Sequence, residues 1–78
     1  MRFHITPHFY RRTGDRVVSV EEAKAVVKYP DKKDKQYTGE HKGLVIRFAK
    51  EASGRTLIVV AEIKNDECWL ITTFYESV

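Results

Sequence analysis

The sequence has a single cysteine and no long apolar run, and both absences narrow the classes of protein it can be. Cys68 has no second cysteine with which to pair, so a disulfide-stapled secreted domain and a cysteine-rich zinc site are both excluded. No stretch approaches the roughly 20 apolar residues that cross a bilayer, and residues 1–7 lack the apolar segment of a signal peptide. We therefore expect a cytoplasmic protein with no membrane partner.

The length and the charge set further bounds. A chain of 78 residues, 42% of them hydrophobic, is long enough for one folded domain, which we place at 1–78, and is too apolar for a disordered chain. The 14 Lys and Arg residues against 11 Asp and Glu residues give a net charge of +3. This balance permits an anionic partner such as RNA without requiring one. Nine of these basic residues lie in residues 1–35, against five acidic ones.

Two helices are predicted in the N-terminal half. Thr6 followed by proline resembles a helix start, which predicts a short helix from Pro7 to Thr13. Ser19 followed three residues later by Glu22 has the spacing of a capping box. The apolar residues that follow recur at helical spacing up to the proline at position 30, which predicts a second helix over Val20–Lys28.

The C-terminal half alternates and is rich in β-branched and aromatic residues, which predicts strands separated by turns. Residues 31–35 are expected to form a solvated connection, and Phe3–Ile5 is a candidate N-terminal strand. The predicted strands are Gln36–Thr38, Leu44–Lys50, Thr56–Ile63 in a central position, and Glu67–Tyr75. The expected fold class is α+β, with two N-terminal helices packed on a three- to four-stranded antiparallel sheet.

His8 is the first candidate for a chemical role. Arg12 lies four residues after it, and Arg11 lies three after it, so the three side chains share one face of the first predicted helix. A neutral imidazole beside permanent cations suits a general base that acts on an anionic substrate. The alternative is a surface histidine with solvated arginines.

Strand residues supply the other candidates. Arg47 interrupts an apolar strand and could hold a phosphate, or it could simply face water on a half-solvated sheet. Strict alternation would put Trp69, Ile71, Thr73 and Tyr75 on one face of the last strand, where Thr73 and Tyr75 could contact a substrate. The alternative is that these two residues are ordinary strand formers. No metal-ligand spacing, phosphate loop or dinucleotide fingerprint is present, so no cofactor is expected.

Four short stretches, taken in order, resemble the small toxin domains of the barnase–EndoU–colicin–RelE nuclease superfamily, in particular BrnT-like and RelE-like toxins. The stretches are residues 8–12 (HFYRR), 17–23 (VVSVEEA), 54–60 (GRTLIVV) and 70–75 (LITTFY). The resemblance implies metal-independent cleavage of RNA by the toxin of a toxin–antitoxin pair, with an antitoxin protein as its partner. BrnT-like toxins continue into a further helix after their last strand, whereas this sequence stops at Val78.

The resemblance also implies roles for particular residues. It makes His8 the base or acid, Arg12 and Arg47 phosphate clamps, and Thr73 or Tyr75 hydrogen-bonding groups for the substrate. Arg11 and Lys50 are further candidates for contacting RNA. Two other interpretations stay open. One is a non-catalytic module that binds RNA or protein, and the other is a small domain that dimerises through an exposed strand edge.

Overall fold

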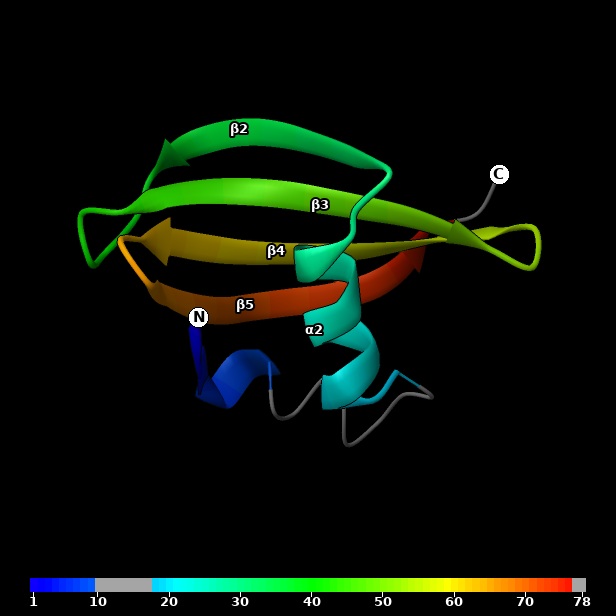
Figure 1. The fold of residues 1–78 in the computed structure, drawn as a ribbon, viewed down its shortest axis with the longest axis horizontal. Coiled ribbons are helices and arrows are strands. Elements are labelled where there is room, and N and C mark those ends of the chain that lie inside the picture. Colours follow the sequence, from blue (N-terminus) through cyan, green and yellow to red (C-terminus); the bar gives the residue numbers. More distant parts are fainter. Residues whose placement is uncertain (10–17, 77–78) are drawn as a thin grey trace.

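The computed structural model describes residues 1–9 and 18–76 and contains one five-stranded sheet. Its strands are β1 (Arg2–Ile5), β2 (Lys32–Thr38), β3 (Leu44–Ala52), β4 (Arg55–Lys64) and β5 (Glu67–Glu76), in the spatial order β1-β5-β4-β3-β2 (Figure 1). Strands β2 to β5 form an antiparallel meander, and β4 is the central strand, as its apolar sequence predicts.

The sheet is mixed, and this corrects the predicted fold class. β1 lies at one edge and pairs in parallel with β5, with Phe3 opposite Cys68 and His4 opposite Trp69. The expectation of a purely antiparallel sheet of three to four strands is therefore wrong. Local patterning shows that Phe3–Ile5 can be a strand, but the neighbour and direction of a strand depend on contacts between residues far apart in sequence.

The helical layer is also smaller than predicted. Helix α2 spans Val20–Lys28 as expected, with both hydrogen bonds of the capping box formed between Ser19 and Glu22. The first predicted helix is described only over residues 7–9, where Thr6 caps it by accepting the Phe9 N–H at 3.3 Å. The remainder of that prediction, including Arg11 and Arg12, lies outside the described residues.

Helix α2 crosses one face of the sheet over β3 and β4 (Figure 1). Ala23, Val26 and Val27 of this helix pack into a core with strand residues such as Phe48 and Val59. We call this side of the sheet the α2 face and the other side the opposite face. Because side chains alternate along strands, the register assigns each strand residue to one of these faces.

The segment before β3 is a strand where a solvated connection was expected. β2 begins at Lys32, and all seven of its residues are exposed at the free edge of the sheet. The lysines of this segment obscured its strand character, because charged residues are common on edge strands and in loops alike. A register shift between Lys35 and Tyr37 marks a bulge in this strand.

Candidate functional site

The opposite face of the sheet carries a hollow of about 470 Å³. Strands β2, β3, β4 and β5, the loop 39–43 and the segment that follows β1 all contribute lining residues. Its polar and aromatic lining includes His8, Tyr37, His41, Glu62 and Trp69. A shallow site with convergent imidazole, carboxylate and aromatic groups is a typical binding site for a small polar or nucleotide-sized group.

Trp69 is the centre of this site. Its indole stacks with the imidazole of His4, at 5.1 Å between ring centroids and an interplanar angle of 17°. It also stacks with the imidazole of His41, at 4.1 Å and 10°. The His4 ring is held in turn by Glu67, whose Oε1 lies 3.0 Å from Nε2. Two histidines separated by 37 positions in the sequence therefore meet at one aromatic side chain.

Glu62 fixes the loop that carries His41. Its side chain is only 2% exposed, and its Oε2 accepts the backbone N–H groups of His41 at 2.9 Å and Gly43 at 2.7 Å. The loop closes on itself through the Gly39 N–H, which donates to the Gly43 carbonyl at 2.9 Å. Charge-assisted hydrogen bonds of this kind are stronger than neutral ones, so the carboxylate holds the loop against the sheet.

His8 completes the histidine set. Thr6 anchors the chain just before it by donating from Oγ1 to the Leu70 carbonyl at 2.8 Å, and His8 itself is exposed and lines the hollow. All three histidines of the sequence thus lie at or beside one hollow. Sequence reasoning identified only His8, because the parallel pairing of β1 and the fold of loop 39–43 cannot be inferred from local patterns.

The other predicted site residues do not gather around His8. Arg47 lies on the opposite face, where its guanidinium pairs with the carboxylate of Glu76, but it is not part of the lining of the hollow. Thr73 is fully buried on the α2 face and donates to the Ile58 carbonyl at 2.9 Å. Tyr75 lies on the α2 face too, packed against the core and 4.1 Å below the Arg55 guanidinium.

A bulge in β5 explains this separation. Leu70 pairs with Ala61 and Thr72 pairs with Val60, so Ile71 is an extra residue and the alternation reverses there. The prediction that Trp69, Thr73 and Tyr75 share one face is therefore wrong. Trp69 faces the hollow, whereas Thr73 and Tyr75 face α2.

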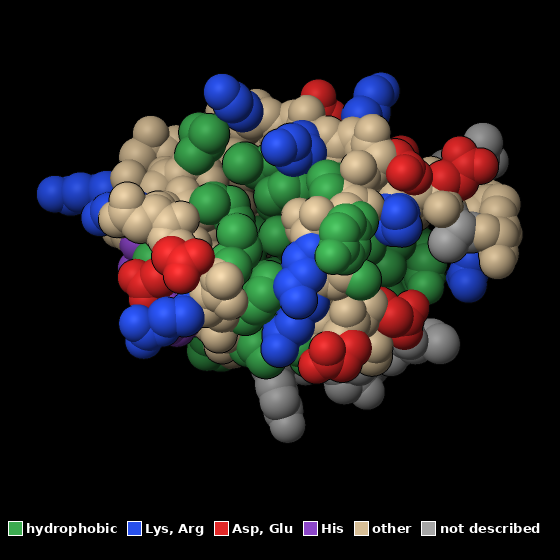
Figure 2. All heavy atoms as spheres, in the orientation of Figure 1, with side chains coloured by type: hydrophobic (Ala, Val, Ile, Leu, Met, Phe, Trp, Pro, Cys, Tyr) green, Lys and Arg blue, Asp and Glu red, His purple; other side chains and the backbone are tan. Residues whose placement is uncertain are grey.

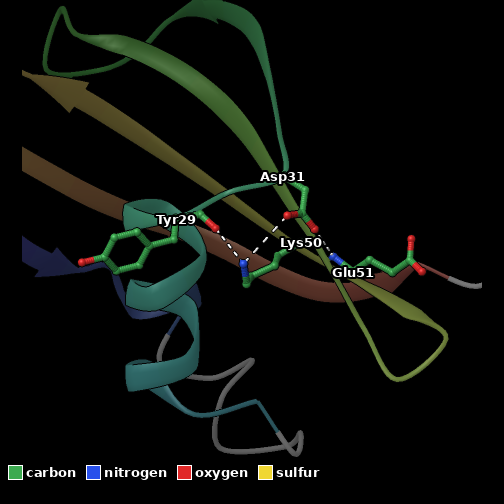
Figure 3. A network of polar contacts seen from close by, with 4 residues as sticks. All are labelled: Tyr29, Asp31, Lys50 and Glu51. Carbon is green, nitrogen blue, oxygen red and sulfur yellow. Dashed lines mark hydrogen bonds and ion pairs between the residues drawn. The ribbon is translucent and has the colours of Figure 1, made fainter.

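Lys50, predicted to contact RNA, holds the end of α2 to the sheet. Its Nζ donates to the Tyr29 carbonyl at 2.9 Å and lies 3.9 Å from Oδ1 of Asp31 (Figure 3). The other oxygen of Asp31 accepts the Glu51 N–H at 2.9 Å, which joins the start of the β2 segment to β3. These contacts give Lys50 a structural role on the α2 face.

Cys68 is not a nucleophile at neutral pH. It is fully buried, and this burial raises the pKa of its thiol to about 12, so the thiolate is scarce. Within residues 1–9 and 18–76, no group of three or more His, Cys, Asp and Glu side chains is placed to hold a metal ion. In the same residues, no helix has the length and apolar character needed to cross a membrane.

The described residues thus form a mixed five-stranded sheet, with α2 on one face and a hollow lined by His8 and His41 on the other. Residues 5–75 match a family described as "Domain of unknown function (DUF4258)", and the chain belongs to this family. Neither the curated proteins nor the solved structures include a match to the chain.

Proposed function

We propose that this protein is a metal-independent endoribonuclease that acts as the toxin of a toxin–antitoxin pair. The observation that carries the proposal is the gathering of all three histidines around Trp69 and its hollow. Cleavage of RNA without a metal needs one group to accept a proton and another to supply one, and imidazoles perform both tasks near neutral pH. The resemblance of the sequence to RelE-like toxins supports the same reaction class.

The reaction assigns separate tasks to His8 and His41. One imidazole accepts the proton of a ribose 2′-OH as this oxygen attacks the adjacent phosphorus, and the P–O5′ bond breaks as the O2′–P bond forms. The other imidazole donates a proton to the departing 5′ oxygen. The products are a 2′,3′-cyclic phosphate end and a 5′-hydroxyl end. Both imidazoles line the hollow and both residues are exposed, which suits proton exchange with a bound substrate.

Aromatic groups beside these histidines suit a nucleobase. Tyr37 and Trp69 line the same hollow, and single-stranded RNA is typically held by bases stacking on aromatic rings. The exposed side chain of Lys42, next to His41, is a candidate phosphate contact. This assignment replaces Arg47, Thr73 and Tyr75, which lie away from the hollow, and it keeps His8.

The proposal is tested by incubating the purified protein with total RNA, in the presence of EDTA, and mapping the ends produced. We expect 2′,3′-cyclic phosphate ends, with cleavage reduced at least about 100-fold by His8→Ala and by His41→Ala, the typical contribution of a general acid or base. His4→Ala is the informative comparison, because it removes an imidazole that is bound to Glu67 and plays no part in the proposed proton transfers. Absence of cleavage, or cleavage that survives both substitutions, would contradict the proposal.

A non-catalytic module that binds RNA or protein is the second candidate. It is favoured by the placement of Arg47 and Lys50 outside the lining of the hollow, which among the described residues contains no lysine or arginine to hold a phosphate. In this case RNA would bind at Trp69 without being cut. A fluorescence titration with single-stranded RNA reports binding at Trp69, the only tryptophan. RNA that binds and stays intact in the same sample would support this second candidate over the nuclease.

A further inference from the structure

The α2 face of the sheet has a hollow beside the end of α2, lined by apolar residues and two lysines. The hollow measures about 200 Å³ and lies between the end of the helix and β2. Its floor consists of Ile46, Phe48 and Ile63, and Val27 of α2 forms one wall. Figure 2 shows apolar side chains exposed beside the helix in this view. Within residues 1–9 and 18–76, the nine-residue helix α2 leaves Ile46 and Ile63 partly exposed.

Lysines surround this apolar floor. Lys28 and Lys33 line the hollow, which has no acidic residue in its lining. Lys35 lies on the same face, because it pairs with Ile46 in the register of β2 and β3. Among the residues that the structure describes, none of these three lysines has an ion-pair partner. Figure 2 shows Lys and Arg side chains next to apolar surface on this face.

We propose that this hollow binds an amphipathic helix of a partner protein, with an apolar stripe toward the sheet and acidic residues along its flanks. A helix about 10 Å wide fits on a sheet face beside a first helix. Its apolar side chains cover Ile46 and Ile63, which are partly exposed, while its carboxylates meet Lys28, Lys33 and Lys35. The inference does not depend on the proposed nuclease activity, since the histidine site lies on the opposite face.

The charge pattern argues against a second copy of this chain as the occupant. In a symmetric dimer the same patch meets itself, which would bring Lys28, Lys33 and Lys35 of one copy toward those of the other. Like charges brought together in this way repel, whereas an acidic partner gains the complementary attraction. The lysines therefore select for an acidic helix and against self-association.

The test uses a fluorescein-labelled helical peptide of about 14 residues, with leucines at i, i+3, i+4 and i+7 and glutamates on both flanks. We expect saturable binding by anisotropy. A peptide of the same composition, scrambled so that its stripe is lost, should bind at least about tenfold more weakly. The Lys28→Glu/Lys33→Glu variant should also weaken binding at least about tenfold, because two attractions become repulsions.

Matched variants separate this site from general charge attraction. Lys32→Glu/Lys64→Glu makes the same change in net charge at two exposed lysines outside the hollow, and should leave binding within about twofold of the unchanged protein. Ile46→Ala should weaken binding severalfold with an unchanged circular dichroism spectrum. The proposal would be overturned if the scrambled peptide bound as tightly as the striped one, or if the two double-lysine variants lost the same affinity for the peptide. It would also be overturned if decanoate, tested as a fatty-acid ligand, bound saturably in the hollow and the peptide did not bind.

Discussion

The carboxylate of Glu62 accepts the backbone N–H of His41, so a buried residue of the central strand sets the position of an imidazole in the candidate site. Glu62→Ala leaves this N–H and that of Gly43 without their acceptor, and should lower the free energy of unfolding by about 2–3 kcal/mol. Urea denaturation measures this loss. Glu62→Gln keeps an acceptor oxygen and should recover part of both stability and cleavage. Equal losses in the two variants would show that the hydrogen bonds to the loop are unimportant.

Position 39 is occupied by glycine because the Glu62 carboxylate lies where a Cβ atom would be. A Cβ atom at this position would lie 2.1 Å from Oε1 of Glu62, so the carboxylate or the loop must move. Either movement breaks the hydrogen bonds from His41 and Gly43 to Glu62, so Gly39→Ala should lower the free energy of unfolding by about 2 kcal/mol. Gly54→Ala is the comparison, because that residue has a positive φ of 78° but open space around it. It should cost only about 1 kcal/mol. A smaller loss at Gly39 than at Gly54 would contradict the tight contact.

The helix boundaries could be predicted because they depend on residues that are close in sequence. Ser19 and Glu22 form their capping box within one turn, and α2 has the predicted bounds. Strands β3, β4 and β5 begin and end within two residues of their predicted positions for the same reason, since Ser53–Gly54 and Asn65–Asp66 are local turn signals. β2 begins four residues before its predicted start, because its lysines resemble those of a solvated loop. The parallel pairing of β1 with β5 joins the two ends of the sequence, and no local signal encodes it.

The candidate site was harder to predict than the fold, because its members come from distant segments. His8 follows a predicted helix start and precedes two arginines, so the sequence indicates it as a candidate. His4 and His41 join the site only because both stack on Trp69. The bulge at Ile71 reversed the faces expected for Thr73 and Tyr75. Neither glycine nor proline marks this bulge in the sequence, so strict alternation was the natural expectation.

Thr73 offers a direct test of this reversal. Its hydroxyl is buried and donates to the Ile58 carbonyl, so we expect Thr73→Val to lower the free energy of unfolding by about 1–2 kcal/mol. The cleavage rate of the folded variant should stay within about twofold of the original. Thr73→Ser keeps the donor and serves as the control for the hydrogen bond. A large loss of cleavage in a stable Thr73→Val protein would instead return this residue to the active site.

Ser19 contributes to α2 through its hydroxyl, which accepts the Glu22 N–H at 3.1 Å. Removing this cap with Ser19→Ala should cost about 1 kcal/mol, and thermal or urea unfolding would measure the loss. Ser19→Asp retains a capping oxygen and should be close to neutral. Equal losses of stability in Ser19→Ala and Ser19→Asp would show that the capping hydrogen bond is not the cause of the loss.

Burial of Cys68 makes stability depend on alkaline pH. The folded-state pKa of about 12 lies above the ordinary value of 9.0, so the unfolded chain loses its thiol proton first. The stability is fully present below pH 9 and is lost as the pH rises toward 12. At pH 10 this one group should lower the free energy of unfolding by about 1.4 kcal/mol relative to pH 7.

Cys68→Ala isolates that contribution, because it removes the thiol but leaves every other titrating group in place. Its stability should fall less steeply between pH 8 and 10.5 than that of the unchanged protein, by roughly 1.4 kcal/mol per pH unit at the upper end. Native protein should also resist alkylation by iodoacetamide at pH 8 and react fully once unfolded in urea. Parallel pH profiles for the two proteins, or rapid alkylation of the native thiol, would show that Cys68 is accessible and ionises normally.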